Sequence, residues 1–181
     1  MDVVERSTPE LDALVGLFYD SIDELGDFQE VDHRDLPNAC HAMLANDRHM
    51  TLNLESHHGS PVDVVVLASG KSKTHYWRKI LLKRQKDDAV VLFGIVRITR
   101  GLLSEEIRDK IEDERIPLGR ILIEGDVLRT VRLLSLWRIA PRQELREIFG
   151  LTAQRPCYGR TALIYCDNAP VIELLEVILT S

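Results

Sequence analysis

A single basic residue inside an apolar strand pattern constrains this chain more than any other feature. The sequence from Tyr76 to Leu82 is rich in aromatic and branched side chains, which favours a half-buried β-strand. Strand alternation places Arg78 on the same face as Tyr76, Ile80 and Leu82. An arginine among such neighbours either lies at a sheet edge with its charged end in water, or it binds an anion. The strand alone favours the first interpretation.

Chain length, net charge and composition restrict the class of protein. The 181 residues fit one domain, 1–181, and a formal net charge of −6 argues against general nucleic-acid binding. The sequence contains no apolar run of membrane-span length and no signal-peptide layout, so we expect a cytoplasmic protein without a membrane partner. Cys40, Cys157 and Cys166 show no C-x-x-C spacing and are typical of reduced thiols. Both a monomer and a homodimer remain open.

The N-terminal quarter predicts two helices. Ser7-Thr8-Pro9-Glu10 is a good helix start, and apolar residues recur at helical spacing over residues 11–25. Residues 26–38 look irregular, and residues 39–46 fit a short second helix.

A sheet is predicted to begin with a hairpin. Residues 50–55 and 62–68 both suit strands, and Gly59 lies in the loop between them. His57 and His58 are neighbours within that turn, so they do not share a strand face and lack a third ligand motif. We therefore interpret them as turn residues and expect no metal site there.

A second hairpin joins the arginine strand to residues 89–98. It brings Arg78 and Arg97 onto adjacent antiparallel strands, although the sequence leaves their relative facing open. The remaining expected elements are a helix at 104–114, a short helix or turn at 116–120, a strand at 128–139, a helix at 141–149, and a closing hairpin of 158–166 with 171–179.

The closing strand carries two glutamates that face opposite ways. Residues 171–179 are apolar on both faces except for Glu173 and Glu176. If one faces water, the other is buried, and a carboxylate in apolar surroundings suits acid–base chemistry. An ion pair with an arginine such as Arg160 is an equally good interpretation of these residues.

Four short blocks together resemble the chorismate pyruvate-lyase family, whose enzymes make 4-hydroxybenzoate and pyruvate from chorismate. Each block is short, but their order and spacing over residues 43–179 make a fairly specific signal. The blocks are His49-Met50-Thr51 through Glu55 to Gly59, Tyr76-Trp77-Arg78-Lys79-Ile80-Leu81-Leu82, Pro117-Leu118-Gly119-Arg120, and Gly159-Arg160 followed by Pro170 and Glu176.

The resemblance implies an α+β fold in which an antiparallel sheet flanked by helices encloses a buried ligand cavity, with no metal and no cofactor. It implies that Met50 touches the ring of the ligand, that Arg78 binds the ring carboxylate, and that Leu118 and Gly119 line the pocket. Glu176 would lie at the hydroxyl end of the ligand. An arginine and a glutamate at opposite ends of a small aromatic acid agree with the strand patterns above.

The activity implied by the resemblance is elimination of the enolpyruvyl group of chorismate as pyruvate. In that reaction Arg78 anchors and orients the substrate, and Glu176 moves a proton. The chain departs from the family at Gly94, which is followed by Ile95, where the studied bacterial members carry a second arginine. Arg97 is the nearest arginine, and we expect it to contribute to binding.

Two alternatives stay open. One is a lyase that acts on a related chorismate derivative. The other is a non-catalytic domain that binds a small aromatic acid, related to the effector domains of bacterial repressors. Against this second alternative, the roughly 40 residues before the region of resemblance are acidic and do not suggest a DNA-binding module.

Overall fold

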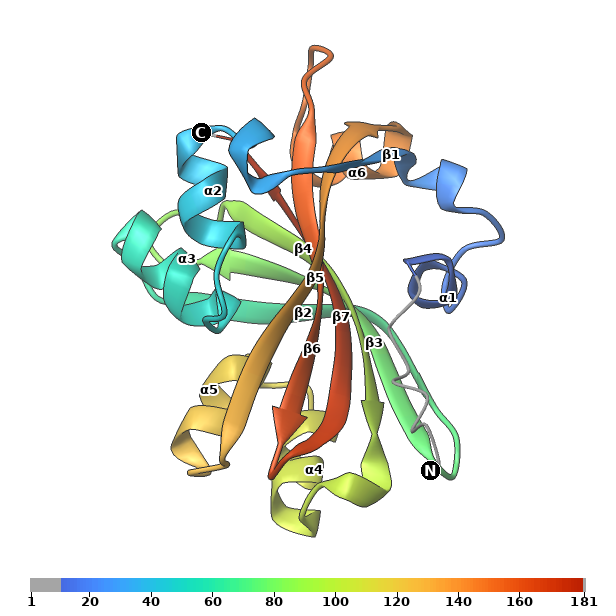
Figure 1. The fold of residues 1–181 in the computed structure, drawn as a ribbon, viewed down its shortest axis with the longest axis vertical. Coiled ribbons are helices and arrows are strands. Elements are labelled where there is room, and N and C mark those ends of the chain that lie inside the picture. The colour runs from blue at the N-terminus through green and yellow to red at the C-terminus, as the bar shows by residue number, and fades with distance from the viewer. Residues whose placement is uncertain (1–10, 181) are drawn as a thin grey trace.

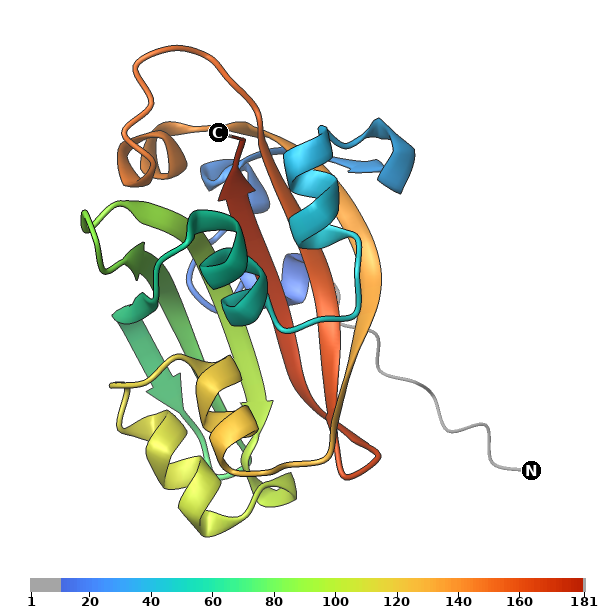
Figure 2. The same ribbon diagram turned by 90° about the vertical axis from the view of Figure 1, so that its left-hand side faces the viewer.

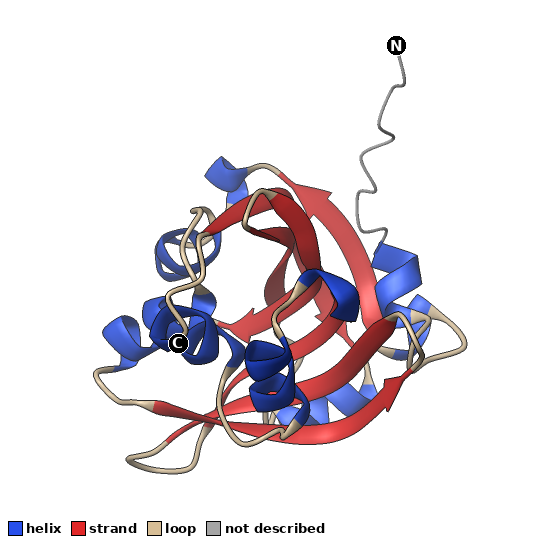
Figure 3. Cartoon of the chain, turned by 90° about the horizontal axis from the view of Figure 1, so that it is seen from below, coloured by secondary structure: helices blue, strands red, loops and turns tan. Residues whose placement is uncertain are grey.

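A computed structural model describes residues 11–180, which form one seven-stranded antiparallel sheet flanked by helices (Figure 1). The strand order across the sheet is β1-β5-β6-β7-β4-β3-β2. Viewed from below, the sheet is strongly curved, and helices lie against it (Figure 3). The strands are β1 (Gly26–Val31), β2 (Val62–Lys71), β3 (His75–Arg84), β4 (Val90–Thr99), β5 (Arg129–Pro141), β6 (Cys157–Cys166) and β7 (Ala169–Leu179).

Helices cover both faces of this sheet. Four of them, α2 to α5, lie in front of one face in Figure 2, and α1 and α6 pack against the opposite face. Their bounds are α1 (Leu11–Val15), α2 (Asn38–Leu44), α3 (Met50–His58), α4 (Glu105–Glu112), α5 (Leu118–Glu124) and α6 (Gln143–Ile148).

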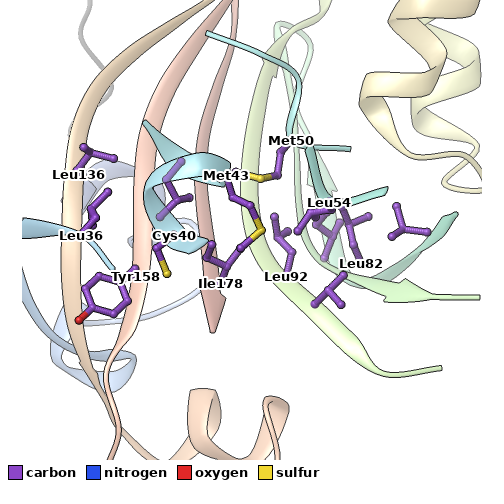
Figure 4. Close-up of a cluster of buried hydrophobic side chains, with 14 residues drawn as sticks. Leu36, Cys40, Met43, Met50, Leu54, Leu82, Leu92, Leu136, Tyr158 and Ile178 are labelled. Atoms are coloured by element: carbon purple, nitrogen blue, oxygen red, sulfur yellow. The ribbon is translucent and has the colours of Figure 1, made fainter. Parts of the chain in front are cut away.

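Because both faces are covered, the central strands are apolar on both sides. On β4, Phe93 and Ile95 pack with α1 and α6, whereas Leu92 points to the opposite core beneath α2 and α3. Figure 4 shows this second core, in which Met43 of α2 and Leu54 of α3 face the sheet. Covering both faces explains why the sequence around Arg78 does not alternate with polar residues.

The prediction of a strand at residues 50–55 is wrong, because these residues begin helix α3. Met50, Leu52 and Leu54 alternate in the sequence as strand residues do, but Leu52 is 49% exposed. Met50, Thr51 and Leu54 are buried, which is helical spacing. Gly59 adopts a left-handed conformation with φ of 58° and ends the helix instead of turning a hairpin.

The N-terminal predictions are partly wrong as well. The expected start at Ser7 to Glu10 lies outside the described residues, and α1 ends at Val15 instead of continuing towards Leu25. A short 3-10 helix, Ile22–Glu24, follows, with Ser21 as its capping residue. The segment predicted to be irregular contains β1, an edge strand that pairs with β5. The helix predicted at residues 39–46 is confirmed as α2.

The second half of the chain follows the predictions closely. The hairpin of β3 and β4, the helices near 104–114 and 141–149, and the strand at 128–139 are all present, and the segment 116–120 leads into α5. The closing hairpin turns at Asp167 and Asn168, which have φ of 50° and 66°. Two positive φ values are the signature of a tight hairpin turn. Strand β7 is therefore fixed in register beside β6.

His57 and His58 are the last residues of α3, not turn residues. Within residues 11–180 no group of three or more His, Cys, Asp or Glu side chains could hold a metal ion. In the same part of the chain no helix is long and apolar enough to cross a membrane.

Candidate functional site

A small enclosed cavity lies between the sheet and the helices α3 and α5. Its volume is about 40 Å³. Its polar wall consists of His49, Thr51, Arg78, Arg160 and Glu176. The other lining residues are apolar or glycine, namely Met50, Ile80, Leu82, Leu92, Gly94, Val96, Leu118, Gly119, Val131, Ile164 and Leu174.

Five of the six predicted site residues line this cavity. They come from four separate parts of the chain: Met50 opens α3, Leu118 and Gly119 open α5, Arg78 lies on β3, and Glu176 lies on β7. Residues from separate blocks of the sequence therefore meet around a single cavity in the fold.

Arg78 is completely buried, at 0% exposure, so it is not a sheet-edge residue with its charge in water. Its Nη1 donates a hydrogen bond to the carbonyl oxygen of Ile111 at 3.3 Å. Its Nε and Nη2 are buried and have no hydrogen-bond partner among the described residues. Burial lowers the pKa of this guanidinium, although arginine still stays charged in proteins. A buried cation with two free donors is costly unless an anion binds it.

The nearest polar neighbours of Arg78 do not supply that anion. The Tyr76 hydroxyl donates to Glu114 Oε1 at 2.6 Å, so the Glu114 carboxylate is already engaged. Burial, together with this hydrogen bond, raises the pKa of Tyr76, which keeps the phenol neutral. No described Asp or Glu forms a salt bridge with Arg78, although the nearby Tyr76 hydroxyl and the Glu114 charge both favour the charged form of its guanidinium.

At the other end of the cavity, Glu176 forms an ion pair with Arg160. Arg160 Nε donates to Glu176 Oε2 at 2.7 Å, and the arginine is only 1% exposed. Its two other nitrogens donate to the carbonyl oxygens of Asn46 and Arg48, each at 3.0 Å. The ion-pair interpretation of the closing strand is therefore correct. Through its bonds to these two carbonyl oxygens, Arg160 also holds the segment before α3 against the sheet.

The strand register sets the separation of Arg78 and Glu176. Arg78 pairs with Val96 on β4, whereas Glu176 pairs with Gly94 on the same strand. Two strand spacings and two residue steps place the Cα atoms about 12 Å apart. Gly94 lies between them without a side chain, and a Cβ atom there would come within 3.2 Å of Ile80 Cγ1. The glycine keeps open the space between the two charged residues.

Arg97 does not belong to this site. It pairs in register with Trp77 and Glu173 on the neighbouring strands, so its side chain leaves the sheet on the face opposite Arg78. Its guanidinium donates through Nε and Nη2 to the Glu173 carboxylate, the Nη2 contact being 2.7 Å. The expected contribution of Arg97 to binding is thus contradicted by its position.

Three polar residues of the cavity, His49, Thr51 and Arg160, were not predicted as site residues. Arg160 was visible only as a possible ion-pair partner, and His49 only as part of a sequence block. His49 Nε2 accepts a hydrogen bond from Arg129 Nε at 2.8 Å. Burial, and then the charges of Arg129 and Arg160, lower the pKa of His49 to about 4. His49 is therefore neutral near pH 7.

Comparison with known proteins identifies the fold. No protein-family profile matches this sequence, and no curated protein matches it. PhnF from Mycobacterium smegmatis superimposes with a TM-score of 0.50 at 10% identity, covering 72% of this chain and 63% of PhnF. The effector domain of PhnF gives a TM-score of 0.50 at 11% identity, covering 72% of this chain and 86% of the domain.

A further solved structure is that of YydK from Bacillus subtilis, described as a possible transcriptional regulator. It gives a TM-score of 0.46 at 13% identity, covering 65% of this chain and 58% of YydK. This chain thus spans less than two thirds of the length of PhnF and of YydK. The predicted fold class, an antiparallel sheet flanked by helices, is confirmed and is the fold of the PhnF effector domain.

Proposed function

We propose that this protein binds a small aromatic carboxylic acid in the cavity, with the carboxylate on Arg78. The observation that carries the proposal is the buried guanidinium whose Nε and Nη2 have no partner. These two nitrogens lie on one edge of the guanidinium fork, the geometry that pairs with both oxygens of a carboxylate. Such a bond strengthens when water is excluded, as it is at 0% exposure.

The rest of the cavity suits an aromatic ring with a polar group at its far end. Met50, Leu118 and Ile80 offer apolar contacts for a ring. Glu176, held in place by Arg160, offers a carboxylate oxygen that accepts a hydrogen bond. A hydroxyl group para to the ring carboxylate would supply that hydrogen. 4-Hydroxybenzoate is the simplest ligand with these features.

Ligand entry requires the cavity to widen. Its volume of about 40 Å³ is smaller than the roughly 150 Å³ of an engineered protein cavity that binds benzene. Since one wall belongs to the sheet, the segments that can move apart are the starts of α3 and α5. The effector domain of PhnF has the same fold.

Calorimetric titration tests the proposal with two ligands of similar size, one with a carboxylate and one with an uncharged amide in its place. The protein should bind 4-hydroxybenzoate, and 4-hydroxybenzamide should bind at least about tenfold more weakly, because it cannot form the charged pair. Arg78→Met should abolish the difference between the ligands. The matched control is Arg97→Gln, which removes an arginine from the other face of the sheet. Equal binding of both ligands would contradict the proposal.

A second candidate function is a cofactor-free chorismate pyruvate-lyase, favoured by the position of Glu176. Breaking the bond between the ring carbon and the enolpyruvyl oxygen, with loss of the neighbouring ring proton, makes the ring aromatic. The enolpyruvate released takes up a proton to become pyruvate, so no other reactant is needed. Arg78 would anchor the ring carboxylate, and Glu176, the carboxylate that lines the cavity, would move the proton.

Pyruvate release separates catalysis from binding alone. The purified protein is incubated with chorismate, and pyruvate and 4-hydroxybenzoate are measured against the spontaneous rate. A lyase should lose most of its turnover in Glu176→Gln and in Arg78→Ala. No pyruvate above the spontaneous rate, with 4-hydroxybenzoate still bound, would reject the lyase for chorismate and leave the binding function. The same assay with a chorismate derivative tests the related-substrate alternative.

A further inference from the structure

The buried guanidinium of Arg78 lies against the C-terminal end of helix α4. Its Nη1 donates to the carbonyl oxygen of Ile111 at 3.3 Å, and the backbone N–H of Glu114 donates to the same oxygen at 3.2 Å. The last carbonyl groups of a helix carry a partial negative charge, which favours a nearby cation. Because they share this acceptor, the Arg78 side chain and the Glu114 backbone lie side by side.

The side chain of Glu114 is also held near this guanidinium. Its Oε1 accepts a hydrogen bond of 2.6 Å from the Tyr76 hydroxyl. Tyr76 lies two residues before Arg78 on β3, so both side chains leave the strand on the same face. The hydroxyls of Ser69 and Tyr76, and then the charge of Arg78, lower the pKa of Glu114, which is therefore ionised near pH 7. A negative charge thus lies near Arg78, although within residues 11–180 no salt bridge to Arg78 forms.

The backbone of Glu114 has a conformation that glutamate rarely adopts. Its φ is 63°, in the left-handed region where glycine is the usual residue after a helix. Other residues held in this region cost stability, and they cluster at functional sites. The strained backbone is explained if the carboxylate has a task that glycine could not perform.

We propose that Glu114 is an internal counter-charge that sets how tightly Arg78 binds a carboxylate, and that Tyr76 holds it back from the guanidinium. The inference rests on the proposed function and concerns the affinity of the same cavity. Glu114 repels the carboxylate of an incoming ligand and so limits its affinity. The Tyr76 hydroxyl gives the Glu114 oxygen a partner other than Arg78. Without that hydroxyl, the Glu114 carboxylate turns onto Arg78 and competes directly with the ligand.

Tyr76 and Glu114 are not among the described residues that line the cavity, so both act through Arg78 as positioning residues. Calorimetric titration with 4-hydroxybenzoate tests their opposite effects. Glu114→Gln should bind this ligand about tenfold more tightly than the wild-type protein, because a repulsive charge is removed at close range. Tyr76→Phe should bind it about tenfold more weakly. The double variant should bind as tightly as Glu114→Gln alone, because no carboxylate is left to compete.

Three controls separate this effect from a general change in the protein. The affinity for the uncharged 4-hydroxybenzamide should change by less than about twofold in every variant. Glu114→Gly suits the left-handed φ, so it should fold and reproduce the gain in affinity. Glu112→Gln removes the same charge from the same helix, but Glu112 is paired with Arg100, whose Nε donates to it at 2.6 Å. This variant should bind 4-hydroxybenzoate as the wild-type protein does.

The outcomes distinguish this inference from the proposed function. If 4-hydroxybenzoate binds through Arg78 but Glu114→Gln and Glu114→Gly bind it no more tightly, the counter-charge is wrong and the cavity proposal stands. A double variant as weak as Tyr76→Phe would overturn the role given to Tyr76, since the hydroxyl would then act on Arg78 directly. An equal gain for the amide would also reject the counter-charge. If neither the wild-type protein nor Glu114→Gln binds 4-hydroxybenzoate, both proposals fail.

Discussion

Two arginines buried in the same cavity have opposite relations to the protein around them. Arg160 is 1% exposed and donates to Glu176 and to two backbone carbonyls, so each of its three nitrogens has a partner. Arg78 is 0% exposed and has one bond, at 3.3 Å, to the Ile111 carbonyl oxygen. The first arrangement is that of a structural residue. The second leaves two nitrogens for a group from outside.

The difference teaches how to interpret a buried charge. Desolvation penalises both guanidinium groups, and only well-made hydrogen bonds and an opposite charge offset that penalty. Arg160 has both within the protein. Arg78 has only one hydrogen bond and no ion-pair partner within the described part of the protein. Its position in the core therefore points to a role in binding and not to a role in stability. Stability measurements on the two positions should therefore differ in sign.

The largest effect is expected at Arg160. Arg160→Met leaves the Glu176 carboxylate without its partner and frees the Asn46 and Arg48 carbonyls. Breaking a buried pair in this way should lower the free energy of unfolding by about 3–5 kcal/mol. Urea denaturation measures it. A loss of unfolding free energy below about 1 kcal/mol would mean that Arg160 does not have the structural role given to it here.

His49 adds a buried neutral base beside these cations, and its stability contribution depends on pH. Its folded pKa of about 4 lies below its usual value of 6.5, so below pH 6.5 the unfolded chain binds a proton that the folded protein does not. Its contribution is complete above pH 6.5 and is lost as the pH falls towards 4.

Between pH 7 and pH 4.5 the loss of stability assigned to His49 should be about 2 kcal/mol. Urea denaturation of the wild-type protein and His49→Gln at pH 7 and pH 4.5 measures it as the difference between the two. His58, whose pKa burial also lowers to about 4, is common to both proteins and cancels. Parallel pH profiles for the two proteins would show that His49 is protonated in the folded state.

Arg78→Met should change stability in the opposite direction from Arg160→Met. It replaces a buried guanidinium that has two unpaired nitrogens with an apolar chain of similar length. The free energy of unfolding should rise by about 1–2 kcal/mol, because the desolvation cost disappears and one long hydrogen bond is lost. Denaturation without ligand tests this, and a marked destabilisation would show that the protein itself satisfies Arg78.

The smallest effect is expected on the opposite face of the sheet. Arg97 and Glu173 form an ion pair that is partly exposed, with side-chain exposures of 27% and 14%. Arg97→Gln should cost about 1 kcal/mol or less and leave the affinity for 4-hydroxybenzoate unchanged. The two measurements are denaturation and calorimetry. A large loss of affinity for 4-hydroxybenzoate would show that Arg97 does contribute to ligand binding.

The sequence was enough to predict the strand of Arg78, because both its composition and its alternation are local properties. It was not enough to predict the facing of Arg97, because that depends on the register of β3 against β4. A one-residue change of register reverses the face, and the pairing here shifts between Leu82 and Lys83. The face of Arg97 was therefore decided by the pairing and not by the pattern.

Helix α3 and strand β1 were missed for a related reason. Met50, Leu52 and Leu54 alternate by chance, and only the packing of α3 against α5 and β2 selects the helix. Strand β1 is a mostly polar edge strand whose identity comes from pairing with β5. The cavity residues were nevertheless identified, because a resemblance between short blocks does not depend on the secondary structure assumed for them.

The most direct test of the contrast between Arg78 and Arg160 is to observe both guanidinium groups during ligand binding. Their Nε–H signals can be followed by ¹⁵N NMR in a titration with 4-hydroxybenzoate, after identification through Arg78→Lys and Arg160→Lys. We predict a large shift of the Arg78 Nε–H signal, as it gains a carboxylate partner, and a small shift for Arg160. A ligand that binds and shifts Arg160 while leaving Arg78 unmoved would contradict the account.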